Sequence, residues 1–182
     1  MLKQMLAVVI VSLLSFHSWA ENCRTDTLDV STPTSRFSTE GVTVTDKDTT
    51  LSWMRCAIGQ SWNGETCTGK AQKLDWQQAM ALVAETNLLG YAGHADWRMP
   101  MVPELASIVE RQCFNPRMNS VVFPGAPSEI FWSSMEKMGS KVFAYTLDFG
   151  GGQAVASAKT NLGAIRLVRG GPWWEPPVAM QQ

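Results

Sequence analysis

The sequence predicts an α+β fold in which two disulfides hold helices and antiparallel strands together. Three observations predict this class. Apolar residues recur at helical spacing in the middle of the chain, they alternate with polar residues before and after it, and four cysteines are available to pair. The chain has 182 residues, which is enough for one domain of ordinary size with a single core.

The first twenty residues are predicted to be a secretory signal peptide. Lys3 gives a positive start, residues 5–14 form a short apolar run, and Ala20 is the small residue before the expected cleavage. The run is too short for a membrane span, and nothing later approaches the ~18 apolar residues that a span needs. We therefore expect a bacterial protein that is periplasmic or secreted and has no membrane span.

The four cysteines are expected to form two disulfides, because all of them lie beyond the signal peptide and an exported chain meets an oxidising compartment. Four cysteines permit three pairings. The segment "CAIGQSWNGETC" has glycines and an Asn-Gly turn that let Cys56 meet Cys67, which leaves Cys23 to pair with Cys113. No Cys-x-x-Cys pair exists and His94 is the one histidine outside the signal peptide, so we predict no metal and no cofactor.

The segment "GVTVTDKDTTLSWMRC" predicts a β-hairpin. Val42 and Val44 alternate with polar residues and would face Leu51 and Trp53 across a turn at "DKDT". Residues 21–40 come before it, are polar and rich in Ser and Thr, and are expected to form an extended leader.

The first predicted helix lies in "LDWQQAMALVAETNLLG". Its apolar residues recur at i, i+3, i+4 and i+7: Trp76, Ala79, Met80 and Val83. Asp75 and Gln78 have the spacing of a capping box, and Gly90 can end the helix.

A second helix is predicted over residues 102–112. Pro103 is acceptable there because it falls in the first turn, where its missing N–H has no partner to lose. The apolar side of this helix would carry four residues: Leu105, Ile108, Val109 and Gln112.

The remaining sequence predicts a loop and then an antiparallel meander. "IFWSS" is short and apolar, and "KVFAYTLDFGGGQAVASAK" has a triple glycine where the chain can reverse. One face of this segment would carry the large side chains Phe143, Tyr145, Leu147 and Phe149. "AIRLVRGG" would close the series, and residues 172–182 would form a tail with prolines and tryptophans outside the core.

These pieces, in this order, resemble the Lcl C-terminal domain family. The motifs are "TDKDTTLSWMRC", "DWRMPMVPEL", "FWSS", a strand before a glycine turn, and "IRLVRGG", and they place the domain at residues 41–171. The resemblance implies a C-type-lectin-like fold, in which two helices pack on a twisted antiparallel sheet with long loops. It also implies that the motif residues support the fold: Asp96, Trp97, Arg98, Pro100, Glu104, Trp132, Arg166 and Arg169.

Within "DWRMPMVPEL", we expect Trp97 to pack under the sheet and Arg98 to pair with Asp96 or Glu104 at the entry of the second helix. The family usually has Thr or Asn after the proline, where it caps this helix, but here Met101 stands in that position. A missing side-chain cap costs about 1 kcal/mol.

Family members occur in exported bacterial proteins, and the best-known case is the terminal domain of a collagen-like adhesin that binds sulfated glycans. This chain has no Gly-X-Y repeat, so adhesion through a collagen stalk does not carry over. Its formal net charge of −1, without a block of lysines or arginines, argues against a nucleic-acid partner.

We predict no catalytic residue. His94 has no Gly-x-Ser-x-Gly motif beside it, no cysteine follows Cys113 to support the oxidation that formylglycine-generating enzymes perform, and the calcium-binding triplets of C-type lectins are absent. Carboxylates that could pair for glycoside hydrolysis are expected to be solvated or structural instead: Asp96, Glu104, Glu110, Glu129 and Asp148.

Recognition of a glycan or a cell-surface protein is therefore the predicted function. Trp62, Asn63 and Glu65 lie in the predicted disulfide loop and are the candidate contact residues. Four other tryptophans are expected in the core: Trp53, Trp76, Trp97 and Trp132. The alternatives are an assembly component of an envelope or extracellular complex and, last, an uncharacterised hydrolase.

Overall fold

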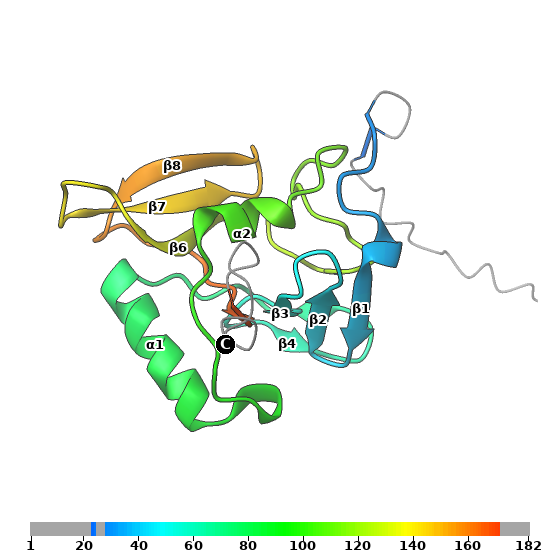
Figure 1. Ribbon diagram of the computed structural model, residues 1–182, viewed down its shortest axis with the longest axis horizontal. Helices are drawn as coiled ribbons and strands as arrows, with labels where there is room; N and C mark the ends of the chain where they lie inside the picture. Colours follow the sequence, from blue (N-terminus) through cyan, green and yellow to red (C-terminus); the bar gives the residue numbers. More distant parts are fainter. Residues whose placement is uncertain (1–22, 25–27, 172–182) are drawn as a thin grey trace, which may run out of the picture.

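The computed structural model describes residues 23–24 and 28–171 (Figure 1). The predicted signal peptide and the tail at 172–182 lie outside the described residues. The described part contains two α-helices and three antiparallel sheets. This confirms the α+β class, but the strands form three separate sheets where one sheet was expected. The elements are η1 (Thr34–Arg36), β1 (Phe37–Glu40), β2 (Thr43–Asp46), β3 (Ser52–Met54), β4 (Ser61–Trp62), β5 (Cys67–Thr68), α1 (Trp76–Leu88), η2 (Tyr91–Gly93), α2 (Val102–Ser107), β6 (Ile130–Glu136), β7 (Phe143–Asp148), β8 (Gln153–Ala158) and β9 (Val168–Arg169).

The predicted hairpin is present as strands β2 and β3, which pair antiparallel with Val44 opposite Trp53. Both side chains are fully buried, as is Leu51. Strand β1 pairs with the other side of β2, so residues 37–40 of the expected leader belong to the sheet. Strand β9 pairs with β3 and completes the order β1-β2-β3-β9.

Helix α1 begins after Asp75 and ends before Gly90, as predicted. Asp75 accepts a hydrogen bond from the N–H of Gln78 at 2.8 Å, and the Gln78 side chain accepts from the N–H of Asp75 at 3.2 Å. Gly90 follows the helix with φ of 64°, a left-handed conformation that glycine adopts without strain. Met80 is 41% exposed, contrary to the prediction, because the face of the helix that packs against the core carries Trp76, Ala79, Leu82 and Val83.

Helix α2 ends at Ser107 rather than at residue 112. The Ser107 hydroxyl donates to the carbonyl of Glu104 at 2.7 Å, and the Glu110 carboxylate accepts from the N–H of Gln112 at 3.0 Å. Side chains thereby bind backbone groups that a longer helix would pair internally. The chain turns away from the helix at this point for that reason.

Strands β6, β7 and β8 form the predicted meander. The face assignment for β7 is partly wrong: Phe143 is 37% exposed, whereas Ala144 and Thr146 on the opposite face are buried. Ala144 packs in the same apolar cluster as Ala79 of α1, so a helix covers the face that carries the small side chains.

The segment "AIRLVRGG" does not close the meander. Ala164 accepts from the N–H of Trp132 at 3.0 Å, and Leu167 accepts from the N–H of Met54 at 3.0 Å. The segment therefore runs from β6 to β3 and ends as β9 in the first sheet. Ile165 and Leu167 are fully buried between the two sheets, and this burial determines where the segment lies.

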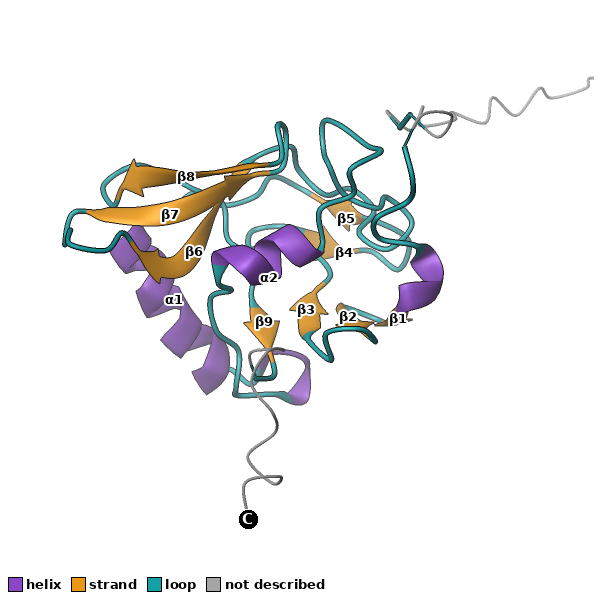
Figure 2. Ribbon diagram, turned by 45° about the horizontal axis from the view of Figure 1, so that its top comes forward, coloured by secondary structure: helices purple, strands orange, loops and turns teal. Residues whose placement is uncertain are grey.

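The two helices cover opposite faces of the meander (Figure 2). Trp132 packs in one apolar cluster with Ala79 of α1, and its neighbour Phe131 packs in another with Leu105 of α2. Successive strand residues point to opposite faces, which agrees with this arrangement. Residues 153–156 of β8 are exposed, so the third strand of the meander is left uncovered.

Both predicted disulfides are present, Cys56–Cys67 and Cys23–Cys113. The second joins the start of the described chain to the loop after α2. Neither described helix is long and apolar enough to cross a bilayer.

Candidate functional site

Two charged residues of "DWRMPMVPEL" form an ion pair at the start of α2, and its carboxylate is buried. Arg98 donates two hydrogen bonds to the carboxylate of Glu104, at 2.8 and 2.6 Å, and Glu104 is fully buried. Glu104 also accepts from the N–H of Met101 at 2.7 Å, while the Met101 thioether is only a weak acceptor for the other half of a capping box. Arg98 donates further to the carbonyl of Gly170, at 3.1 and 2.9 Å. The ion pair therefore joins α2 to the end of β9.

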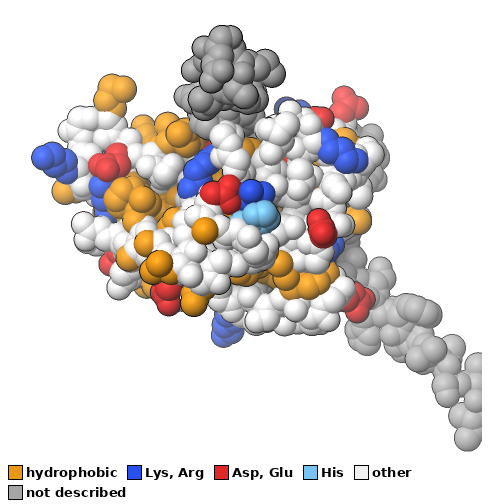
Figure 3. Space-filling model, turned by 60° about the horizontal axis from the view of Figure 1, so that its bottom comes forward, with side chains coloured by type: hydrophobic (Ala, Val, Ile, Leu, Met, Phe, Trp, Pro, Cys, Tyr) orange, Lys and Arg blue, Asp and Glu red, His pale blue; other side chains and the backbone are white. Residues whose placement is uncertain are grey.

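Asp96, the other possible partner of Arg98, pairs with Arg169 at 2.8 Å. The Arg169 hydrogen bond lowers the pKa of Asp96 below its ordinary value. The Asp96 side chain is 56% exposed, and Figure 3 shows acidic and basic side chains side by side around a histidine on this face. The His94 ring lies edge-on to Trp97, with 6.4 Å between ring centroids.

The remaining motif residues lie inside the fold. Trp97 and Trp132 are each 1% exposed, and their indole N–H groups donate at 2.9 Å to the carbonyls of Tyr91 and Leu74. Pro100 is buried, and its carbonyl accepts from the N–H of Ser134 at 2.8 Å. These contacts hold the segment before α2 between α1 and β6.

Arg166 is a fully buried cation. Its guanidinium donates to the carbonyl of Met54 at 2.8 Å and lies over two rings, 4.9 Å from the centroid of Phe123 and 5.9 Å from that of Phe131. Burial lowers the pKa of Arg166 to about 9, so the group still carries its proton at neutral pH. The ring faces compensate part of the lost hydration through cation–π attraction.

Trp62, Asn63 and Glu65 come together on the hairpin of β4 and β5. The Asn63 side-chain oxygen accepts from the N–H groups of Glu65 and Thr66, at 3.0 and 2.8 Å, so it shapes the turn. The Trp62 ring is half-buried and has the Arg55 guanidinium 4.0 Å from its centroid. One face of the ring is thus already in contact with a cation.

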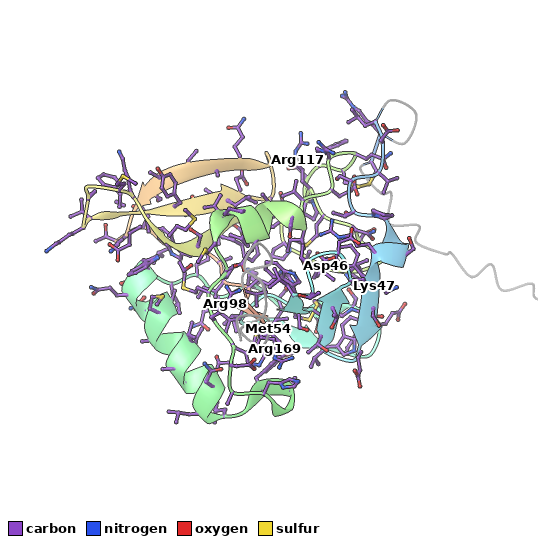
Figure 4. All side chains as sticks on the ribbon, in the orientation of Figure 1. Asp46, Lys47, Met54, Arg98, Arg117 and Arg169 are labelled. Carbon is purple, nitrogen blue, oxygen red and sulfur yellow. A yellow bond between two sulfur atoms is a disulfide. The ribbon has the colours of Figure 1, made fainter. Side chains whose placement is uncertain are left out.

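Two arginines without an ion-pair partner among the described residues, Arg111 and Arg117, lie together elsewhere on the domain. The open hollow beside the end of α2 has a volume of about 480 Å³, and we call it the Arg117 hollow. It is lined by Ser31, Ala106, Ser107, Val109, Arg111, Arg117 and Gly152. Figure 4 shows Arg117 near the far end of α2 from Arg98 and Arg169.

Arg117 is firmly placed but has few partners for its charge. Its backbone N–H donates to the carbonyl of Phe149 at 2.6 Å, and its backbone carbonyl accepts from the N–H of Glu110 at 3.1 Å. Its Nη1 reaches the carbonyl of Arg111 at 3.4 Å, while its buried Nε–H has no partner among the described residues. Neither arginine forms an ion pair within the part of the chain that the structure describes.

Gly152 explains how the arginine fits. A Cβ built on Gly152 would lie 2.6 Å from the Cδ of Arg117, closer than real atoms approach. A side chain at this position would have to displace the arginine stem, and the φ of 76° at Gly152 also favours glycine. Sequence reasoning missed the Arg117 hollow, because α2, the loop after it and this turn meet only in the folded chain.

The lining of the hollow is chemically suited to an anionic group. A guanidinium presents a planar fork of N–H donors that matches carboxylate and sulfate oxygens. The lining residues include two guanidiniums and no carboxylate. Among the described residues, no cluster of three His, Cys, Asp or Glu side chains that could hold a metal ion was found.

The comparisons with known proteins agree with the fold motifs. The sequence model of the Lcl C-terminal domain matches residues 42–169, which is most of the chain. The chain belongs to the Lcl C-terminal domain family. No curated protein matches the chain in sequence.

Most of the Arg117 hollow lies within the matched Lcl C-terminal domain, since Arg111, Arg117 and Gly152 fall in residues 42–169. Ser31 comes from the segment before it. The hollow is thus completed by a part of the chain that the Cys23–Cys113 disulfide and a buried carboxylate attach to the domain.

That carboxylate is Glu110, which is 3% exposed. It accepts hydrogen bonds from the N–H and hydroxyl groups of Ser31 and Thr32, at 2.7 to 3.1 Å, and from the N–H of Gln112. Burial by itself raises the pKa of Glu110, but these donors outweigh burial and lower the pKa to about 2. Glu110 therefore remains charged and fixes Ser31 at the edge of the hollow.

The depressed pKa of Glu110 predicts sensitivity to acid. The folded pKa lies below the ordinary value of 4.5, so the stabilisation is complete above pH 4.5 and is lost as the pH falls toward 2. The full loss corresponds to roughly 3 kcal/mol of unfolding free energy. Urea unfolding at a series of pH values should show a shallower acid dependence for Glu110→Gln than for the unmodified protein. Equal dependence of the unfolding free energy on pH in the two proteins would contradict this role. The pKa of Asp46 is also lowered, and this residue contributes equally to the pH dependence of both proteins.

Proposed function

We propose that the chain is an exported recognition domain that binds an acidic glycan or an acidic cell-surface partner and catalyses no reaction on it. One observation carries the proposal: Arg111 and Arg117 line one hollow, without an ion-pair partner in the described residues and without a lining carboxylate. Arg98 and Arg169 are ion-paired and Arg166 is buried against aromatic rings, whereas Arg111 and Arg117 line an open hollow.

The surroundings of this hollow support recognition. Its backbone is fixed by Glu110, by Phe149 and by the Cys23–Cys113 disulfide, so both arginine side chains start from fixed backbone positions. Two disulfides fit an oxidising periplasmic or extracellular compartment. We also infer a C-type-lectin-like arrangement of helices and sheets, as the family resemblance implies.

Absence of catalysis is part of the proposal. His94 packs against Trp97, and the buried carboxylates Glu104 and Glu110 are already engaged by arginine and by backbone donors. These contacts leave the groups expected of a hydrolase in structural roles. A hydrolase therefore ranks last among the candidate functions.

A glycan array, followed by titration with a matched acidic and neutral oligosaccharide, tests the proposal. The mature protein should bind the acidic sugar, and Arg117→Gln should weaken binding by about 10- to 100-fold, because a hydrogen bond to a charged group contributes roughly 1.5–3 kcal/mol. Binding should also weaken as salt is added.

Two variants serve as controls for the titration. Arg169→Gln makes the same charge change at a surface ion pair and should leave affinity unchanged. Trp62→Ala tests the aromatic candidate on the β4–β5 hairpin separately. Absence of binding to every glycan and acidic surface protein tried would refute the proposal, as would equal losses in Arg117→Gln and Arg169→Gln.

A second candidate function is an assembly component of an envelope or extracellular complex. It is favoured by exposed apolar side chains on the meander and the turn between β6 and β7: Ile130, Met135, Met138, Val142, Phe143 and Val155. Co-purification of a repeatable protein partner after mild crosslinking would support this candidate.

A further inference from the structure

The outer edge of β8 is an unprotected strand edge. Strand β8 has six residues, pairs with β7 in six consecutive positions without a bulge, and ends the order β6-β7-β8. Its sequence, "QAVASA", has neither a charge nor a proline. Residues 153–156 are exposed, and within the described chain no strand pairs with this edge.

The other long sheet edges are shielded. On the outer edge of β6, the backbone N–H of Trp132 donates to the carbonyl of Ala164, and the backbone N–H of Ser134 donates to the carbonyl of Pro100. Strand β9 pairs with the backbone of Arg98, and β1 is four residues long and ends in Glu40. Charges, short length and covering segments are the usual means of blocking edge-to-edge pairing. Strand β8 has none of them.

The register shows which backbone groups of β8 point outward. The backbone N–H of Lys159 donates to the carbonyl of Val142 at 2.9 Å, so residues 142 and 159 form a hydrogen-bonded pair of the ladder. Hydrogen-bonded and non-hydrogen-bonded pairs alternate along an antiparallel ladder. Val155 therefore bonds to β7, whereas Ala154 and Ala156 direct their N–H and C=O groups away from it.

We propose that β8 pairs with β8 of a second copy of this chain, antiparallel, about a twofold axis at Val155. Ala154 of each copy then exchanges backbone hydrogen bonds with Ala156 of the other copy. This pairing satisfies the outward N–H and C=O groups of both residues in both copies. The two Val155 side chains meet directly as a non-hydrogen-bonded pair, the closer type of cross-strand contact. The two meanders join into one six-stranded sheet.

Charge and side-chain size favour a second copy over another extended segment. A twofold axis places like residues near one another, which would bring like charges together if β8 carried any. The strand is uncharged, and the nearby Lys159 is held by Glu136 at 2.9 Å and lies 4.1 Å from the Trp76 ring centroid. Val155 is 47% exposed and offers a β-branched side chain to its own copy. An acidic or basic peptide would find no complementary charge on this edge.

Crosslinking through a single introduced cysteine tests the register. In the mature protein, Val155→Cys should form a covalent dimer on mild oxidation, because a non-hydrogen-bonded pair separates Cα atoms by about 4.5 Å, within the range of a disulfide. Gln153→Cys is the matched control, since its partner in this register is Ser157 of the other copy. Crosslinking of Gln153→Cys as efficiently as Val155→Cys would overturn the register.

Sedimentation tests the dimer itself. The unmodified protein should show a dimer whose population rises with concentration, and Val155→Lys should weaken it at least tenfold, since two like charges would face each other. Ala156→Pro should do the same while keeping the fold, because the N–H that it removes points outward.

Circular dichroism and thermal unfolding show whether each variant is folded. If Val155→Lys or Ala156→Pro misfolds, the remaining variant of the two provides the test. A monomer at every soluble concentration, or a dimer that neither substitution weakens, would overturn the proposal. The inference does not depend on the ligand of the Arg117 hollow, because neither residue 155 nor residue 156 lines it.

Discussion

Arg98→Ala should lower the free energy of unfolding by about 3–5 kcal/mol, because it leaves the carboxylate of Glu104 buried without its cation. Glu104 is fully buried and receives two charge-assisted hydrogen bonds from this arginine. The substitution also removes two donors from the carbonyl of Gly170, where β9 ends. Urea unfolding at neutral pH measures the loss, and the melting temperature should fall by roughly 10 °C.

Arg169→Ala is the matched control, because it breaks a neighbouring ion pair whose carboxylate, Asp96, is 56% exposed. Its cost should stay below about 1 kcal/mol, as is usual for surface pairs. Similar losses for the two variants would show that burial of Glu104 does not determine the effect. If Arg98→Ala kept normal stability and selectively lost ligand binding, the motif would be a binding site and not a support for the fold.

Local sequence signals predicted the elements that local interactions determine. The capping box of Asp75 and Gln78 and the glycine at position 90 defined α1, and alternation around a turn defined the β2–β3 hairpin. The disulfide preference was also right, because a glycine-containing loop favoured the pairing of Cys56 with Cys67.

The errors arose where tertiary contacts decide the outcome. The apolar spacing through Ile108 and Gln112 predicts a longer α2, yet Glu110 binds segments about 80 positions earlier in the chain and ends the helical path. Likewise, residues 164–169 have strand-like composition, but burial between two sheets determines which sheet they join.

The candidate site could be predicted only in part. Trp62, Asn63 and Glu65 are adjacent in sequence, and the structure does bring them onto one hairpin. The Arg117 hollow has no such signal, because Ser31, Arg117 and Gly152 are far apart in the chain. Arginine is also common on protein surfaces, and its lack of an ion-pair partner becomes visible only in the folded chain.

Replacing Cys23 and Cys113 together by alanine should cost about 4–5 kcal/mol of unfolding free energy, because the bond closes a loop with a sequence separation of 90. In the chain-entropy model the shorter Cys56–Cys67 bridge, with a separation of 11, contributes about 2–3 kcal/mol. The long loop restricts many more conformations of the unfolded chain than the short one does.

The effect on ligand binding should follow the same order, since the Cys23–Cys113 bond anchors the segment that brings Ser31 to the Arg117 hollow. Denaturant unfolding of both double variants gives the two costs, and titration of the folded proteins with an acidic glycan gives the two affinities. Hydrogen bonds from Ser31 and Thr32 to Glu110 remain after the bond is removed, so the segment should stay in place at neutral pH but detach more readily below pH 4.5. A larger stability loss from the short bridge would show that packing around Cys56 and Cys67, and not loop closure, determines what these disulfides contribute.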